Sequence, residues 1–207
     1  MIKGIHHVGV SVADVDRAVR FYRDAAGLDP TDRADSGGVA WTELLGADGC
    51  VDATLLRGTN AYLLITRFAG ADRNRTPPTV AEAGITHVCS QAQDIDALAA
   101  RYRAAGAHFR EEPVGLGTGT IYAYVRDPEQ NVVELEGTFY APATDRPWLA
   151  HVAMATPDID RLASFYSRVV DRPVANTGVF ADNPILDTVT GLTDVHVKAA
   201  WIEGENQ

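Results

Sequence analysis

The chain has 207 residues, of which 46% are hydrophobic and 22% charged, and its formal net charge at pH 7 is −10. These values are typical of a folded domain and exclude disordered, collagen-like and disulfide-scaffold classes. An acidic chain without a basic run is a poor partner for nucleic acid or an anionic membrane. No apolar run reaches the ~18 residues of a membrane-spanning helix. The two cysteines, Cys50 and Cys89, predict a cytoplasmic protein with reduced thiols.

A short pattern occurs three times along the chain. Each copy starts with His-Val in a strand-like run, at His7, His87 and His151. In every copy an Asp follows the His after seven and after nine residues, and a Tyr follows it after fifteen. The first Asp stands where a helix N-cap belongs, and the second lies in the first turn, where the helix dipole favours negative charge. We therefore predict that each copy opens with a strand, a turn and a helix whose Tyr faces the core.

Strand-like runs punctuated by Gly, Pro and Asp follow the first two predicted helices. They cover 39–45, 51–56 and 61–68 in the first copy, and 107–110, 120–125 and 131–137 in the second. Each full copy therefore predicts a βαβββ module, the first at 1–70 and the second at 84–140. Segments 69–80 and 141–147 connect the copies.

The third copy, 148–207, contains part of a module. Its end resembles 46–61 of the first copy, with Trp201–Gly204 lying over Leu55–Gly58 after one residue of slippage. The strand that comes next in the first copy has no counterpart in the third. We hypothesise that the natural chain continues into a four-module protein, or that a partner chain supplies this strand.

The repeats and the block YVRDPEQNVVEL at 124–135 resemble the vicinal oxygen chelate superfamily, which includes glyoxalase I, methylmalonyl-CoA epimerase, fosfomycin and bleomycin resistance proteins and extradiol dioxygenases. The resemblance covers essentially the whole chain, with Gln130 where the family usually has Gly. It implies an α+β fold in which paired βαβββ modules form a cup-shaped mixed sheet, with residues 1–140 as one complete cup. A homodimer is compatible with this fold.

Members of the family hold a divalent metal in the cup, with ligands from the first and last strands of each module. Carried over to this chain, the resemblance implies His7, His87 and Glu134 as metal ligands. The fourth position falls at Leu64, or at Leu63 if the register shifts by one, and both are apolar. Two imidazoles and one carboxylate leave metal positions open for a substrate with adjacent oxygens or for O₂.

This triad resembles that of the extradiol dioxygenases, which implies Fe(II) and oxidation of a catechol-like small molecule. Tyr124, ten residues before Glu134, is the candidate catalytic residue, as a hydrogen-bond donor to bound substrate. The additional active-site His of those enzymes has no match in 115–120, which favours the alternative of a glyoxalase- or epimerase-type lyase or isomerase with Mn, Co, Ni or Zn. A further alternative is a non-catalytic binding protein of the bleomycin-resistance type, with an apolar cup lined by Trp41, Leu64 and Tyr124.

Several of these residues also have a structural interpretation. His7 and His87 are compatible with core histidines bonded to backbone groups. His6 and Glu136 are the substitutes if the register or the choice of carboxylate changes. His151 lacks partner ligands within its own module, so we interpret it as structural unless a longer assembly builds its working site around it.

Overall fold

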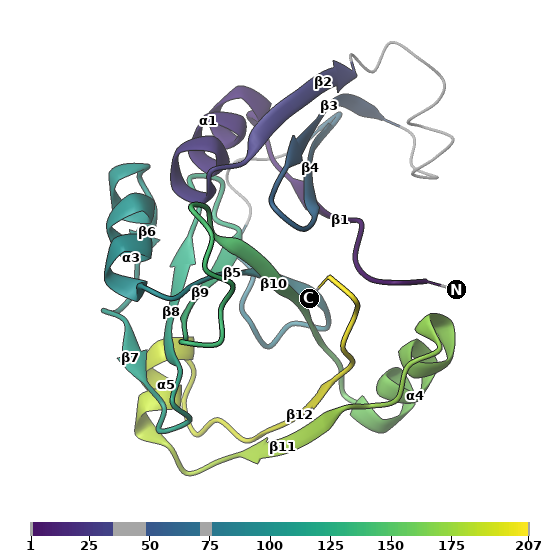
Figure 1. Ribbon diagram of the computed structural model, residues 1–207, viewed down its shortest axis with the longest axis vertical. Helices are drawn as coiled ribbons and strands as arrows, with labels where there is room; N and C mark the ends of the chain where they lie inside the picture. The colour runs from purple at the N-terminus through teal and green to yellow at the C-terminus, as the bar shows by residue number, and fades with distance from the viewer. Residues whose placement is uncertain (1, 35–48, 71–75, 207) are drawn as a thin grey trace.

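The computed structural model describes residues 2–34, 49–70 and 76–206 (Figure 1). The first module contains β1 (His7–Ser11), α1 (Val15–Ala26), β2 (Asp29–Ala34), β3 (Cys50–Arg57) and β4 (Tyr62–Phe68). The second contains β5 (Gly84–Ala92), α3 (Ile95–Ala104), β6 (His108–Phe109), β7 (Val114–Gly115), β8 (Ile121–Arg126) and β9 (Val132–Gly137). The third contains β10 (Trp148–Ala155), α4 (Ile159–Val170), β11 (Asn176–Phe180), α5 (Pro184–Thr190) and β12 (Val197–Trp201). The predicted strand 39–45 and Trp41 lie outside the described residues.

The helix starts follow the repeated Asp. The side chains of Asp14, Asp94 and Asp158 each accept a hydrogen bond from the backbone N–H three residues later, at 3.0, 2.9 and 3.0 Å. The aromatic residue at the end of the pattern faces the core in two copies, because Tyr22 and Tyr102 are each only 1% exposed. The same local chemistry therefore starts each of these three helices.

The first two modules share one strand order. Their sheets run β1-β4-β3-β2 and β5-β9-β8-β6, with β1 parallel to β4 and β5 parallel to β9. This confirms the α+β class with paired βαβββ modules in mixed sheets. Within the described residues no helix is long and apolar enough to cross a membrane.

The pairing of the modules differs from the expectation that 1–140 close one cup. The outer edge of β5 is hydrogen-bonded to antiparallel β10, so the continuous sheet joins the second module to the third. The first and second modules meet through their helices instead, as α1 and α3 pack together (Figure 1). The physical reason is that each first strand offers a similar open edge, and burial of the apolar face shared by α1 and α3 decides which edge remains available.

The contact between the first and second modules has an aromatic core and a buried polar bond. The rings of Phe21 and Tyr102 meet edge to face, 5.8 Å apart, and the hydroxyl of Tyr22 donates to Asp127 at 2.9 Å. The tyrosine bond supplies the partner that a buried hydroxyl requires. These contacts fix the second module against the first and leave its concave sheet face turned toward the third.

The third module contacts both of the others, the second through β10 and the first through Asn60 and Asn206. Its helix α4 has no buried residue, whereas α5 packs against β8 of the second module. Strands β11 and β12 form a two-stranded sheet of their own. In the first module the last strand, β4, lies between β1 and β3, and in the second module β9 lies between β5 and β8. In the third module, within the described part of the chain, no strand lies between β10 and β12.

Two equivalent asparagines join the first and third modules reciprocally. Asn60 donates to the backbone oxygen of Leu149 and accepts from its N–H, at 2.8 and 3.0 Å. Asn206 donates to the backbone oxygen of Ile5 at 2.8 Å. Each Asn stands two residues after the Gly that the repeats share, and each acceptor stands two residues before a repeat His. The first and third modules are therefore related by an approximate two-fold arrangement.

The turn between β8 and β9 keeps a left-handed residue despite the absence of Gly. Gln130 has φ +70°, its N–H donates to the Asp127 backbone oxygen at 2.9 Å, and the Asp127 carboxylate accepts from the N–H of Glu129 and Asn131. A left-handed conformation costs a residue with a Cβ about 1 kcal/mol.

We expect Gln130→Gly to raise the free energy of unfolding by about 0.5–1 kcal/mol, since Gly removes this strain at some cost in chain entropy. Gln130→Val should lower it, because a β-branched side chain disfavours this conformation further. Urea unfolding of both variants measures the two effects. A glycine variant less stable than the parent would show that the turn is not strained.

Candidate metal centre

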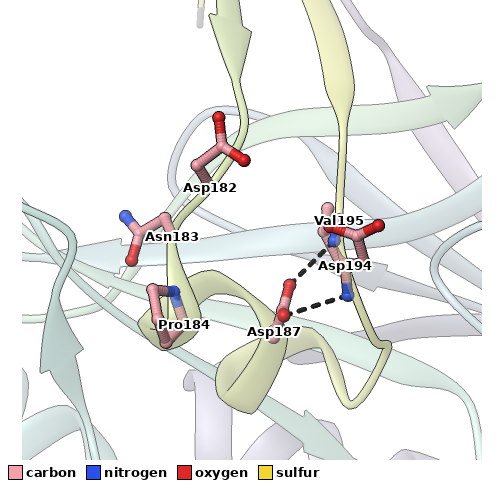
Figure 2. Close-up of a pocket in the computed structure, with 6 residues that line it drawn as sticks. All are labelled: Asp182, Asn183, Pro184, Asp187, Asp194 and Val195. Carbon is pink, nitrogen blue, oxygen red and sulfur yellow. Dashed lines mark hydrogen bonds between the residues drawn. The ribbon is translucent and has the colours of Figure 1, made fainter.

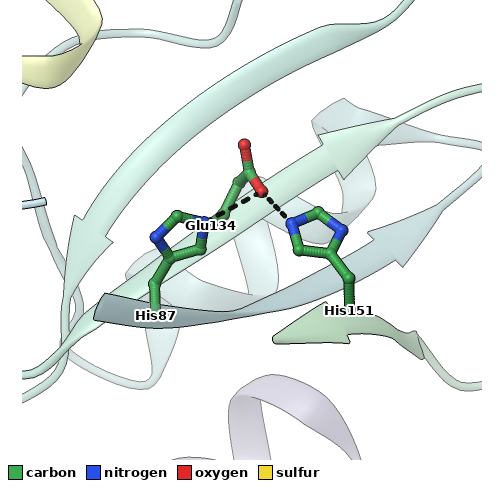
Figure 3. Close-up of side chains that lie close together, drawn as sticks. All are labelled: His87, Glu134 and His151. Atoms are coloured by element: carbon green, nitrogen blue, oxygen red, sulfur yellow. Dashed lines mark ion pairs between the residues drawn. The ribbon is translucent and has the colours of Figure 1, made fainter. Parts of the chain in front are cut away.

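Three ionisable side chains from three neighbouring strands converge on the concave face of the second sheet. His151 Nε2 lies 2.7 Å from Glu134 Oε2, and His87 Nε2 lies 3.4 Å from the same oxygen (Figure 3). The side chains of His87 and Glu134 are 8% exposed and that of His151 is 34% exposed. One donor atom from each residue can be chosen so that all three lie within 4.8 Å of one another.

The strand order brings these residues together. β5 lies between β10 and β9, with Ala153 of β10 and Val132 of β9 in register with His87. Side chains two residues apart on a strand share a face, so Glu134 lies on the same face as Val132, the register partner of His87. The site therefore depends on the β5–β10 edge, which joins the second module to the third.

The electrostatics of the cluster favour a charged carboxylate. Burial alone would raise the pKa of Glu134, but hydrogen bonds from His151 and His87 lower that pKa well below its ordinary value. Burial acts on His151 in the opposite sense, yet the bond to Glu134 raises the pKa of His151 above its ordinary value. The two pKa shifts therefore both favour an ion pair between Glu134 and His151 in the metal-free protein.

A family model describes most of this architecture. The model of the Glyoxalase/Bleomycin resistance protein/Dioxygenase superfamily matches residues 4–135, which is more than half of the chain. The chain belongs to this superfamily. The resemblance carried by the repeats and by the block at 124–135 is thereby confirmed.

Named relatives in the superfamily are lyases and an epimerase. A lactoylglutathione lyase of Arabidopsis thaliana is 25% identical over 171 residues, which cover 79% of this chain and 53% of that protein. A 2-epi-5-epi-valiolone epimerase of an Actinomyces species is 31% identical over 123 residues, covering 56% of this chain and 67% of that protein. The chain spans little more than half the length of the two lactoylglutathione lyases that it matches, 53% and 58%.

Solved structures give the same fold. Glyoxalase I from Zea mays is similar over 98% of this chain and 68% of the maize chain, with a TM-score of 0.66 and 19% sequence identity. A glyoxalase family protein from Bacillus cereus covers 66% of this chain and 95% of its own, with a TM-score of 0.56 and 24% identity. At these identities the likeness establishes the glyoxalase fold and not a shared activity.

Of the three metal ligands expected for a glyoxalase-family cup, the structure brings His87 and Glu134 together and places His7 elsewhere. His7 lies on β1 in the other sheet, is exposed, and has its Nδ1 3.1 Å from Nδ1 of His6. The β1–β4 register aligns His7 with Tyr62 just as the β5–β9 register aligns His87 with Val132. Leu64 therefore occupies the place of Glu134 in the first module, and it is buried.

His151 takes the place expected for His7 beside Glu134. The signal that could have found it is the repeat itself, because His151 occupies the same position as His7 and His87 in its module. A structural role for His151 follows only if its partner ligands have to come from the third module. The edge pairing of β10 with β5 supplies them from the second module.

Tyr124 and the expected substitute Glu136 border the cluster. Tyr124 is in register with Glu134 across β8 and β9, and its ring centre lies 5.1 Å from that of His87. Burial and the neighbouring Glu134 raise the pKa of Tyr124 well above its ordinary value, so its hydroxyl stays protonated. Glu136 accepts from Gln91 Nε2 at 2.7 Å.

A second group of potential ligands lies in an exposed hollow of about 220 Å³ in the third module. Asp182 and Asp194 line this hollow, and His196 lies beside them, with its Nε2 3.2 Å from Asp194 Oδ1 and 3.9 Å from Asp182 Oδ1. Beneath them the Asp187 carboxylate accepts from the backbone N–H of Asp194 and Val195, at 3.0 and 2.8 Å (Figure 2). We assign Asp187 the structural role of fixing the loop that leads into β12.

The ion pair requires a protonated His151, whereas a bound metal requires a neutral one. Metal affinity should therefore depend on pH. The raised pKa of His151 means that its pair with Glu134 stabilises the metal-free protein fully below the ordinary His pKa of 6.5. That stability is lost as pH rises through the higher folded-state value. A metal needs the neutral imidazole, so its affinity should rise about tenfold per pH unit below that value.

Thermal unfolding with and without Mn²⁺ between pH 6 and 9 tests this expectation. The difference in Tm between the two forms should grow with pH until His151 has lost its proton. A difference that is constant or shrinks over this range would show that Mn²⁺ does not compete with the His151 proton.

Proposed function

We propose that this chain is a metal-dependent enzyme of the vicinal oxygen chelate type whose metal is held by His87, Glu134 and His151. The single observation that supports this most is the buried Glu134 carboxylate with an imidazole nitrogen on each side, at 2.7 and 3.4 Å. The substrate is a small molecule with two adjacent oxygens.

The donor set fits a divalent metal. Nitrogen and oxygen ligands with bonds of ~2.0–2.2 Å to one ion lie about 3 Å apart, which is close to the two separations in the cluster. Burying a carboxylate is costly unless it is paired or binds a cation. Burial would raise the pKa of Glu134, but the hydrogen bonds from His151 and His87 lower it, which supports a charged carboxylate that can bind a cation. Two His and one carboxylate also leave positions open for substrate.

In this proposal the residues of the site would have distinct roles in the reaction. A bound metal would supply Lewis acidity toward the two substrate oxygens. His87, Glu134 and His151 hold it at the floor of the concave sheet. The protonated hydroxyl of Tyr124 donates a hydrogen bond to substrate and orients it beside His87. Because the Glu134 side chain is buried, water has little access to its carboxylate and competes less with a cation for the negative charge.

Isomerase or lyase chemistry is the reaction that we favour, with Zn, Mn, Co or Ni as the metal. The relatives with the named activities are a lactoylglutathione lyase and an epimerase. We therefore propose movement of a proton on the carbon next to a metal-bound carbonyl. Extradiol dioxygenase chemistry with Fe(II) is the second candidate, supported by the two-His, one-carboxylate set and by Tyr124 beside it.

Proton exchange and oxygen uptake distinguish these reactions. Manganese-loaded protein should incorporate solvent deuterium into dihydroxyacetone or into the glutathione adduct of methylglyoxal, as followed by mass spectrometry. Tyr124→Phe should slow this exchange about tenfold or more. Oxygen uptake with catechol by iron-loaded protein would instead support the dioxygenase. Binding of these probes with neither reaction would contradict both and favour a non-catalytic binding protein.

The cellular setting and assembly are proposals of the same kind. We propose a cytoplasmic location, because Cys89 is a free and buried thiol next to the ligands. The homodimer expected from the family stays a prediction, which sedimentation of the metal-loaded protein would test.

A further inference from the structure

Cys89 is a fully buried thiol next to the proposed ligand Glu134. It is 0% exposed. It follows His87 by two residues on β5 and therefore shares its face. In the β5–β9 register it stands directly beside Glu134. The Cys89 thiol therefore lies among the polar side chains of the proposed metal site.

The thiol has a carboxylate partner that is itself held in place. Cys89 Sγ lies 3.6 Å from Glu136 Oε2 and donates to it. The Gln91 amide donates to the same oxygen at 2.7 Å, so two neighbouring side chains on β5 orient this carboxylate. Glu136 is thereby positioned rather than free to move.

The two groups also share a histidine with the first ligand set. Donor atoms of Cys89, Glu136 and His151 can be chosen that all lie within 4.8 Å of one another, as they can for His87, Glu134 and His151. One sheet face therefore carries two overlapping sets of three donors. The second set differs chemically, because a thiolate selects thiophilic ions such as Zn²⁺ over hard ions such as Mg²⁺.

We propose that Cys89, Glu136 and His151 form a second metal seat, overlapping the first at His151 and selective for thiophilic divalent ions. It rests on the proposed function in that His151 is taken to be a metal ligand. A thiophilic ion displaces the proton of the Cys89 thiol on binding, and Glu136 supplies the second negative charge. The chain then binds Zn²⁺ or Co²⁺ through sulfur, whereas Mg²⁺ and Mn²⁺ bind only at the His87 set.

Cobalt spectroscopy tests the second seat without an activity assay. Co²⁺ added to the reduced full-length chain should give a sulfur-to-cobalt charge-transfer band in the near ultraviolet. Cys89→Ala should abolish the band, while Cys50→Ser, the matched control at the other cysteine, should retain it. His87→Ala should also retain the band, because His87 belongs only to the first ligand set. Glu136→Gln should weaken cobalt binding, measured by the band, at least tenfold, and it serves if Cys89→Ala does not fold.

The outcomes separate this proposal from the proposed function. Cobalt bound near one equivalent without a charge-transfer band would overturn the second seat and leave the first. A band that persists in Cys89→Ala would also overturn it. No cobalt bound by the parent protein would overturn both proposals.

Discussion

Glu134→Gln is expected to weaken the binding of a divalent metal by at least about 100-fold. The change keeps the size and shape of the side chain but removes the charge that the two imidazoles hold in place, and even residues that merely support metal ligands change affinity 10–100-fold. Glu134 Oε2 is the atom that both His87 and His151 approach. Competition with a chromophoric chelator, using Mn²⁺ to avoid the proposed thiolate seat, measures the affinity.

His151→Ala and His7→Ala form the informative pair for this experiment. Both residues occupy the same place in the repeat, but only His151 lies in the cluster. We expect His151→Ala to weaken Mn²⁺ binding by a similar factor, and His7→Ala to leave it within twofold of the parent. Loss of binding in His7→Ala with full binding in His151→Ala would contradict the assignment.

Phe21→Ala is expected to lower the free energy of unfolding by about 3–5 kcal/mol, the usual cost of truncating a buried aromatic residue. Phe21 is 2% exposed, and its ring meets those of Tyr22 and Tyr102 at 5.0 and 5.8 Å. The variant would leave a cavity where α1 packs against α3. Chemical denaturation of the metal-free protein measures this loss.

Phe165→Ala is the matched control, because Phe165 occupies the same repeat position on α4 and is 48% exposed. We expect its truncation to cost less than about 1 kcal/mol, as is usual for side chains that are not part of a packed core. Equal losses for Phe21→Ala and Phe165→Ala would show that α4 is packed in solution as tightly as α1.

Local chemistry was predictable from the sequence because it repeats. The three Asp N-caps act through bonds to backbone groups three residues away, so a short window contains all the information needed to locate them. The pairing of Glu134 with a His from the start of β5 was likewise predictable, because both belong to one module and their spacing sets the register. The same spacing argument places Leu64 at the position in the first module that corresponds to Glu134.

The pairing of modules was not predictable in this way. The sequences of β1, β5 and β10 each predict a strand that contains a His. The local sequence does not indicate which two of these three strands pair at their edges. That choice depends on burial of the α1–α3 interface and on the reciprocal Asn60 and Asn206 bonds, which act over long separations in the chain. The consequence is specific: the structure places His151, and not His7, beside His87 and Glu134.

Anomalous X-ray diffraction from crystals grown with Mn²⁺ would test the central claim most directly. We predict one strong anomalous peak between His87 Nε2, His151 Nε2 and the Glu134 carboxylate, at bonding distance from all three. A peak beside His7, or none at any of these residues at saturating Mn²⁺, would contradict the account.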